Sequence, residues 1–201
     1  MNLEEFKNLK VVVADAECLR DVVKPYSFDK SEYLGNAVTC TYAPHLDETK
    51  DWIGDGSIIS MWEYMLQFDA VITYNGMNFD YPLWGGSVYG PEHVKAKKFF
   101  EKSFKGKTID LARDFQDYFK KRIRLIDVSV PTLGDAKEMD GGFAPQHWRA
   151  GRCLEVIEYC RGDNRRTNDI YQKVIRGESL IYKDLRKDLA AIEFQPTIKL
   201  R

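Results

Sequence analysis

The segment Val11-Val12-Val13-Ala14-Asp15-Ala16-Glu17 decides the fold of this chain. Its apolar part, together with Leu9, predicts a strand over residues 9–14, and its richness in β-branched valine is typical of a central strand buried on both faces. Asp15 and Glu17 follow at the predicted end of that strand. Residues two apart on a strand point to the same side, so we expect the two carboxylates to converge. Like charges this close repel each other unless a cation lies between them, although a lone Asp-x-Glu pair is more often a solvent-facing strand end.

Further strands and helices alternate along the rest of the chain. β-branched runs predict strands, and apolar residues spaced three or four apart predict helices, one of them with Ser57 at its N-cap. The expected strands are residues 37–42, 70–74 and 108–111, and the expected helices are residues 58–66, 112–121, 133–139 (opened by Pro131-Thr132) and 152–176. Residues 80–107 are expected to be helical in part, with interruptions at Gly85-Gly86 and Gly90-Pro91. A peripheral helix and a tail are expected after Glu178. Strands that alternate with helices in this way predict an α/β fold.

Length and composition bound the class of protein. A chain of 201 residues, 44% hydrophobic and 30% charged, can bury a core without disulfides or structural metal. No repeat and no linker divides it, so we expect one domain over residues 1–201. Its apolar runs are far shorter than the roughly 20 residues that span a membrane, and residues 1–6 are acidic rather than a signal segment. We therefore expect a cytoplasmic protein with no membrane partner. The four cysteines form no C-x-x-C pair, which favours free thiols in a reducing cytosol.

Basic residues are concentrated in two segments although the net charge is only −1. Residues 95–107 carry six lysines and one glutamate, and residues 120–124 read KKRIR. This asymmetry suits a protein that binds a polyanion on one stripe, and a solvated lysine face is the alternative. Phe99, Phe100 and Phe104 lie among the lysines. The rings would serve a single-stranded nucleic acid as stacking platforms. Phe99-Phe100 could equally form a buried helix face, and a core position is favoured for at least one of these two.

Two further acidic positions accompany the first pair. Asp80 follows the predicted strand 70–74, near the expected start of a helix, where a negative charge is favourable in any case. Tyr159 and Asp163 are four residues apart on the long predicted helix and therefore share a face. Taken alone, that pair is equally well a buried tyrosine hydrogen-bonded to a carboxylate.

Oxygen ligands from separate elements are what hard divalent cations such as Mg²⁺ or Mn²⁺ require. A pair of such ions about 4 Å apart can activate a water and stabilise both oxygens of a phosphoryl displacement. Asp15, Glu17, Asp80 and Asp163 could supply three or four such ligands if the elements that carry them come together.

Three motifs occur in an order that resembles the DEDD superfamily of 3′–5′ exonucleases, in its tyrosine-containing DEDDy branch. They are Asp15-x-Glu17, Asn75-Gly76-x-x-Phe79-Asp80-x-Pro82 and Tyr159-Cys160-x-x-Asp163-x-x-x-Thr167. The segments 133–136 and 148–151 also look like those of stand-alone exonucleases similar to the proofreading domains of family B DNA polymerases. The resemblance covers residues 9–175 and leaves 178–201 as a C-terminal extension. It implies a ribonuclease H-like α/β fold, with a mixed central sheet flanked by helices.

The resemblance also implies roles for individual residues. Asp15 would bridge two Mg²⁺ or Mn²⁺ ions, with Glu17, Asp80 and Asp163 completing their coordination. Tyr159 would orient the attacking water or the scissile phosphate. The groups expected near the 3′-terminal nucleotides are Cys18, Leu19, Asn75 and Phe79. Two departures from the family pattern are Cys18, where Thr or Ser is usual and a better donor, and Asn164, where an apolar residue is usual; neither removes a metal ligand.

The predicted function is metal-dependent 3′–5′ hydrolysis of single-stranded nucleic acid, releasing nucleoside 5′-monophosphates. DNA is favoured, and the residues do not exclude RNA, because no motif reports on contacts to the 2′ position. A ribonuclease H-like endonuclease and a non-catalytic nucleic-acid-binding module are the alternatives. The chain could act alone or beside a polymerase or helicase.

Overall fold

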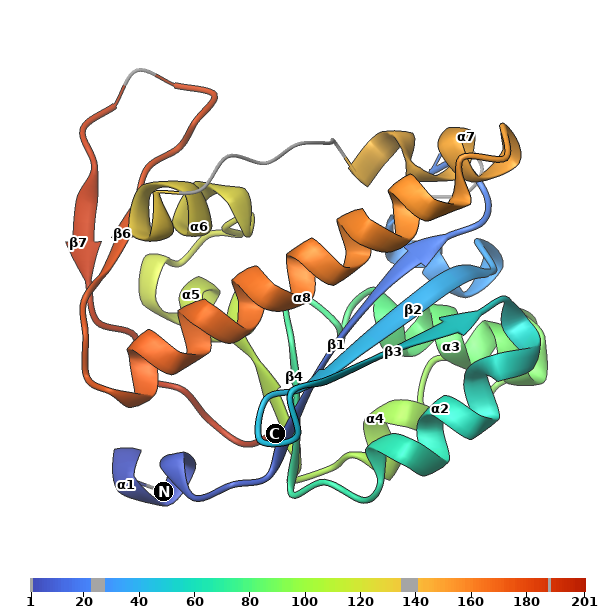
Figure 1. Ribbon diagram of the computed structural model, residues 1–201, viewed down its shortest axis with the longest axis horizontal. Coiled ribbons are helices and arrows are strands. Elements are labelled where there is room, and N and C mark those ends of the chain that lie inside the picture. The colour runs from blue at the N-terminus through green and yellow to red at the C-terminus, as the bar shows by residue number, and fades with distance from the viewer. Residues whose placement is uncertain (1, 23–27, 135–140, 188) are drawn as a thin grey trace.

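A five-stranded mixed sheet forms the centre of the protein, as seen in a computed structural model that describes residues 2–22, 28–134, 141–187 and 189–201. The strand order is β3-β2-β1-β4-β5 (Figure 1). β1 runs antiparallel to β2 and parallel to β4, and β5 continues the parallel side. The strands are β1 Val11–Cys18, β2 Asn36–Ala43, β3 Glu48–Ile53, β4 Ala70–Thr73 and β5 Thr108–Asp110.

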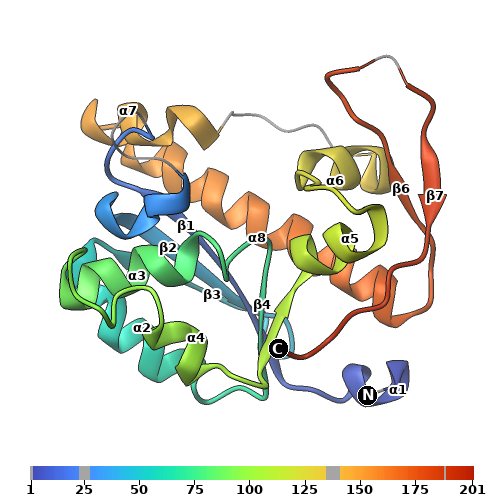
Figure 2. The same cartoon turned by 180° about the vertical axis from the view of Figure 1, so that it is seen from behind.

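Helices cover both faces of this sheet. Val11 and Val13 of β1 pack into the core beneath α5, α6 and α8, while Val12 and Ala14 pack into the core formed with α2, α3 and α4 (Figure 2). This alternation is what the continuous apolar run requires of a central strand. The helices are α1 Leu3–Lys7, α2 Ile58–Met65, α3 Asp80–Tyr89, α4 Phe99–Ser103, α5 Leu111–Phe119, α6 Ile126–Leu133, α7 Ala144–Arg149 and α8 Cys153–Ile175.

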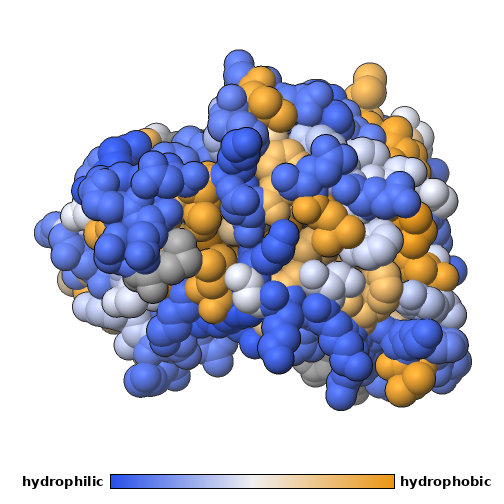
Figure 3. All heavy atoms as spheres, turned by 90° about the horizontal axis from the view of Figure 1, so that it is seen from below, coloured by the Kyte–Doolittle hydropathy of each residue, from blue (hydrophilic) through white to orange (hydrophobic). Residues whose placement is uncertain are grey.

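Short 3₁₀ turns and a hairpin complete the described chain. The turns are Phe28–Tyr33, Asp55–Ser57 and Gly141–Phe143, and the hairpin is formed by β6 Leu180–Tyr182 and β7 Ile192–Phe194. Among the described helices, none is both long and apolar enough to cross a bilayer. On the face drawn in Figure 3, hydrophilic residues surround separate groups of hydrophobic ones, which is ordinary for a protein surface.

Several predicted elements are confirmed, with corrected limits. The central strand is longer than residues 9–14, because β2 pairs with it as far as Cys18, and Asp15 and Glu17 therefore lie within the strand rather than after it. The helix after Ser57 is present, but the Ser57 hydroxyl donates to the carbonyl of Gly54 and does not cap the helix. The edge strand β3 was not predicted, since ETKDWI contains no apolar run.

The expected interruption at Gly85-Gly86 is wrong, because α3 continues through both glycines. A Cβ at position 85 would lie 1.6 Å from the carbonyl oxygen of Ala96, and one at position 86 would lie 2.0 Å from that of Glu32. The glycines therefore permit two close backbone contacts with α3. The helix ends at Gly90, whose φ of 81° is costly for other residues.

Pro131 lies inside α6 and does not open a helix, which is a second correction. A proline deprives the carbonyl four residues earlier of its helical partner. Here that carbonyl belongs to Asp127 and accepts a hydrogen bond from the backbone N–H of Lys183, at 2.9 Å. α6 ends at Leu133, and residues 135–139 of the predicted helix lie outside the described part. The donor Lys183 directly follows β6, so the C-terminal extension is a hairpin against α6 rather than a peripheral helix.

Candidate metal centre

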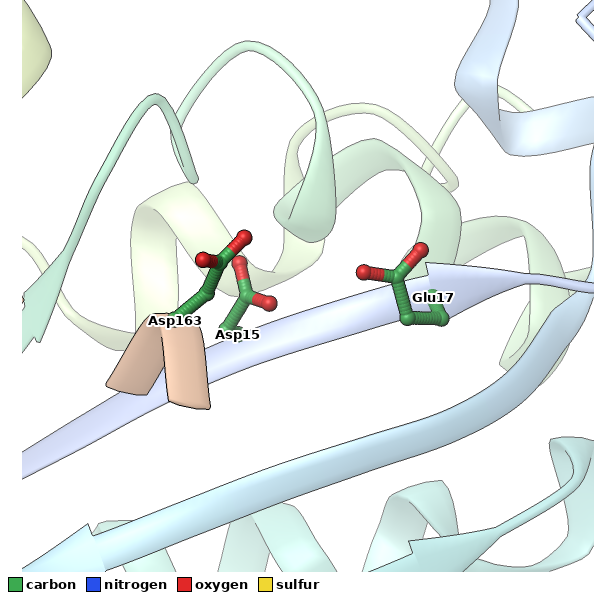
Figure 4. A group of neighbouring side chains, drawn as sticks. All are labelled: Asp15, Glu17 and Asp163. Atoms are coloured by element: carbon green, nitrogen blue, oxygen red, sulfur yellow. The ribbon is translucent and has the colours of Figure 1, made fainter. Parts of the chain in front are cut away.

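Three carboxylates from two elements meet at the surface of β1. Asp15 and Glu17 come from the strand and Asp163 from α8, and each offers an oxygen within 4.8 Å of the others (Figure 4). Glu17 and Asp163 are each 8% exposed. In Figure 4 the carboxylates of Asp15 and Asp163 point toward each other, and that of Glu17 lies farther along the same strand. The convergence predicted for Asp15 and Glu17 is therefore present, and α8 adds the third group.

Hydrogen bonds between α8 and the sheet fix the position of Asp163. The thiol of Cys160 donates to the carbonyl of Asp15 at 3.3 Å, and the side-chain amide of Asn164 donates to the carbonyl of Cys40 at 2.7 Å. Asn164, one of the two departures from the family pattern, thus ties the helix to β2. Arg166 contacts the Asp163 carboxylate at 3.3 Å from one turn along the helix.

Asp80 lines the same cleft from a third element, the start of α3, but lies outside the group of three. It is 2% exposed, and within the described residues its Oδ1 has no hydrogen-bond partner. Burial, followed by the nearby charges of Asp15 and Asp110, raises the pKa of this carboxyl well above its ordinary value. A buried carboxylate oxygen without a partner is costly for the protein alone and suits a cation ligand.

Asp110, which no sequence pattern singled out, supports the turn that precedes Asp80. It ends β5 and is fully buried, and it accepts hydrogen bonds from the backbone N–H groups of Asn75, Met77 and Arg113 at 2.8, 3.1 and 3.4 Å. Two of these donors belong to the segment that precedes Asp80, in which Asn75 has a φ of 70°. Asp110 thereby holds the turn of the second motif. A polar residue at the end of a buried strand was the available signal.

Tyr159 lies one turn before Asp163 on α8 and lines the cleft. It is 9% exposed. Burial is the main reason that its pKa is raised above the ordinary value, and the charges of Asp163, Glu17 and Asp15 add to the effect. The phenol is therefore protonated at neutral pH and acts as a hydrogen-bond donor.

Three of the four residues expected near a 3′ terminus line the cleft, namely Cys18, Asn75 and Phe79. The thiol of Cys18 donates to the carbonyl of Arg20 at 3.3 Å, and burial raises its pKa to about 12, so it presents an uncharged side chain. Leu19 is not among the lining residues. Its backbone N–H donates to the carbonyl of Gly35, and its carbonyl accepts from Arg149.

The two basic segments have different positions. The cleft has a volume of about 550 Å³, and Arg122 and Arg124 of the second segment line it, whereas no residue of 95–107 does. Phe100 and Phe104 are fully buried among core aromatics. The interpretation of those two rings as stacking platforms is therefore wrong, and the alternative of a buried helix face is correct for Phe100.

The donor set fits a hard cation. All four candidate ligands are carboxylates, and they reach one cleft from β1, α3 and α8. Mg²⁺ and Mn²⁺ prefer such oxygen ligands. The group of Asp15, Glu17 and Asp163, of which the last two are buried, could hold a metal ion, with the unpartnered oxygen of Asp80 in the same cleft.

Comparison with solved structures supports the fold. No protein-family model and no curated protein matches the sequence. The structure is similar to the family B DNA polymerase from the hyperthermophilic archaeon Pyrobaculum calidifontis, with a TM-score of 0.50 and 13% sequence identity over 83% of this chain. The match covers 24% of the polymerase chain, so this chain spans about a quarter of its length. Together with the mixed sheet, this likeness confirms the predicted ribonuclease H-like α/β fold, and at such low identity it shows the fold alone.

Proposed function

We propose that this protein is a metal-dependent 3′–5′ exonuclease of the DEDDy type, which hydrolyses single-stranded nucleic acid to nucleoside 5′-monophosphates. The observation that carries the proposal is the meeting of Asp15, Glu17 and Asp163 in one cleft, although Asp163 is far from the others in sequence. Asp80 and Tyr159 complete the motif set on the walls of that cleft. The fold similarity to a DNA polymerase favours DNA over RNA as the substrate. Residues 1–201 would form one such domain.

The four carboxylates would hold two Mg²⁺ or Mn²⁺ ions. When bound, such ions supply an activated water and stabilise the charge that develops on the phosphate oxygens. The chain contributes the positions of the ligands. β1 fixes Asp15 and Glu17, the bonds from Cys160 and Asn164 fix α8, and Asp110 fixes the turn before Asp80.

Tyr159 would act as a donor rather than as a general base. A phenol whose pKa is raised above its ordinary value of about 10 holds its proton at neutral pH. Its hydroxyl can therefore donate to the attacking water or to a phosphate oxygen and orient either one. Asn75 and Phe79, which line the cleft, would contact the terminal nucleotide.

The test uses a 5′-labelled single strand, made once as DNA and once as RNA, with Mg²⁺ or Mn²⁺. We expect a ladder that shortens from the 3′ end and is absent with EDTA and with Asp15→Ala. A circular single strand separates the alternatives, since an endonuclease cuts it and an exonuclease does not. Cleavage of the circle would replace the proposal with an endonuclease. Binding without hydrolysis of any strand would replace it with a binding module.

A further inference from the structure

The C-terminal hairpin and the second basic segment lie side by side, although about 60 residues separate them in sequence. The backbone N–H of Lys183 donates to the carbonyl of Asp127 at 2.9 Å, and that of Leu185 donates to its carboxylate at 3.2 Å. The ammonium group of Lys121 lies 3.1 Å from the hydroxyl of Tyr182 and over its ring. Figures 1 and 2 both show the hairpin beside α6.

This contact brings two groups of positive charge together, and we call their basic residues the basic wall. The described segments 120–127 and 183–187 together contain seven basic residues and two carboxylates, those of Asp127 and Asp184. Both carboxylates are buried and serve as internal anchors. The basic wall consists of Lys120, Lys121, Arg122, Arg124, Lys183, Arg186 and Lys187.

The basic wall begins inside the cleft of the carboxylates. Arg122 and Arg124 line that cleft. The guanidinium of Arg124 is fixed by two hydrogen bonds to Asp127, at 2.8 and 2.5 Å, and lies 3.9 Å from Asp184. Because Asp184 also contacts Arg186 and Lys187, the hairpin loop is connected to this side of the cleft by ion pairs. Arg186 and Lys187 themselves are exposed.

The other basic segment offers no such path. Residues 95–107 line no part of the cleft, and their helix α4 packs against α3 through Phe100. Lys97 pairs with Glu32, and Lys107 donates to the carbonyl of Phe68. The segment is therefore a solvated face with a buried aromatic side.

We propose that the basic wall is the binding track for the 5′ side of a single-stranded nucleic acid whose 3′ end occupies the cleft. The strand would pass from the carboxylates over Arg122 and Arg124 and reach Arg186 and Lys187 on the hairpin loop. This inference rests on the proposed exonuclease function, which it deepens by assigning the substrate path. Cationic side chains along such a path bind phosphates without regard to sequence and release counterions.

The test compares two double variants that remove the same charge from exposed positions. R186Q/K187Q changes the basic wall, and the matched control K98Q/K102Q changes the segment 95–107. Binding of a 5′-labelled 15-nucleotide strand is measured by fluorescence anisotropy in EDTA, so that it depends on neither metal nor hydrolysis. For R186Q/K187Q we expect affinity at low salt to fall about 10-fold, and the slope of log affinity against log salt to lose about 1.4. For the control we expect affinity and slope to match the wild type.

Additional strands and variants test whether the loss of affinity comes from the basic wall. The deficit of R186Q/K187Q should shrink with a 3-nucleotide strand, which is too short to reach the hairpin, and the charge-preserving R186K/K187R should restore the salt slope. DNA and RNA strands that show equal deficits would indicate phosphate recognition. Equal losses in both double variants, or no loss in either, would overturn the track. A wild type that binds the long strand through the basic wall yet degrades no strand would overturn the exonuclease and leave the track standing.

Discussion

Two buried aspartates lie at the starts of the helices that follow neighbouring parallel strands, and their hydrogen bonds differ although burial raises the pKa of both carboxyls. Asp80 follows β4 and begins α3, and Asp110 ends β5 and caps α5. Asp80 is 2% exposed and Asp110 is fully buried. Asp110 accepts three backbone hydrogen bonds, whereas the Oδ1 of Asp80 has no partner among the described residues.

The contrast shows that the burial of a carboxylate does not indicate its role, whereas the hydrogen bonds that it accepts do indicate that role. A buried carboxylate with its hydrogen bonds made stabilises the turn that surrounds it. A buried carboxylate with an oxygen left unpartnered costs stability, and is retained where function requires it. Asp110 is thus part of the scaffold of the second motif, and Asp80 is the group that the scaffold presents to the cleft.

Asp80→Asn is expected to have the largest effect, because it should lower activity and raise the stability of the metal-free protein. If Asp80 is a metal ligand as proposed, its loss is expected to lower kcat/KM for a single strand at least about 100-fold, which corresponds to about 2.7 kcal/mol. Without metal, the variant should be more stable than the wild type, because a neutral amide replaces a buried carboxylate whose pKa is raised. Exonuclease assays and thermal unfolding in EDTA measure the two effects.

The same variant has a second signature in the presence of metal. Mn²⁺ at about 100 times its dissociation constant should stabilise the wild type by about 2.7 kcal/mol, and should stabilise Asp80→Asn less. A variant that loses stability in EDTA and keeps full activity would show that Asp80 belongs with Asp110 in the scaffold.

Asp110→Asn is the matched change, and it should lower the stability of the protein and have a smaller effect on activity than Asp80→Asn. An asparagine oxygen can still accept, but its NH₂ group then faces a backbone N–H of Asn75 or Met77, at a cost of about 1–3 kcal/mol. Activity should fall about 10-fold as the turn shifts, with the Mn²⁺ site retained. Urea unfolding and Mn²⁺ titration check this, and unchanged stability with lost Mn²⁺ binding would assign Asp110 to the cation site.

Tyr159→Phe tests the third motif with a smaller expected effect. Removal of one hydroxyl donor should lower kcat about 10-fold and leave KM and Mn²⁺ affinity near the wild-type values, because the carboxylates stay in place. Single-turnover kinetics with a labelled strand measure the chemical step. If the phenylalanine variant fails to bind Mn²⁺, Tyr159 supports the metal site rather than orienting the reacting groups.

The sequence predicted the pairs that depend on local geometry, and missed what depends on distant contacts. Strand periodicity places Asp15 and Glu17 on one side of β1, and helix periodicity places Tyr159 and Asp163 on one face of α8. That α8 crosses β1 followed only from the family resemblance, because no local rule positions a helix on a sheet. The role of Asp110 also depends on a contact, with a segment more than thirty residues earlier.

Proline and glycine produced the errors in the helices for the same reason. Pro131 fits inside α6 because the distant Lys183 supplies the missing donor. Gly85 and Gly86 lie inside α3 because other backbone segments approach the helix so closely there that a Cβ would collide with them. Local rules treat both residue types as helix breakers. The polar edge strand β3 lacked any apolar pattern and was identified only through its pairing with β2.

A third buried aspartate, Asp114, lies between the two extremes and sharpens the comparison. Its Oδ1 accepts from Arg201 at 2.6 Å, while its Oδ2 has no partner among the described residues. Burial raises its pKa from 3.8 to about 6 although Arg201 lowers it. The folded state therefore binds more protons than the unfolded state between those values, and this contribution to stability, fully present below pH 3.8, is lost as the pH rises through about 6.

The unfolding free energy of the wild type should fall by at most about 1.4 kcal/mol per pH unit more steeply than that of Asp114→Asn between pH 4 and 6, measured by urea unfolding in EDTA. Equal slopes would mean that the ion pair with Arg201 fully offsets the effect of burial on the Asp114 carboxyl.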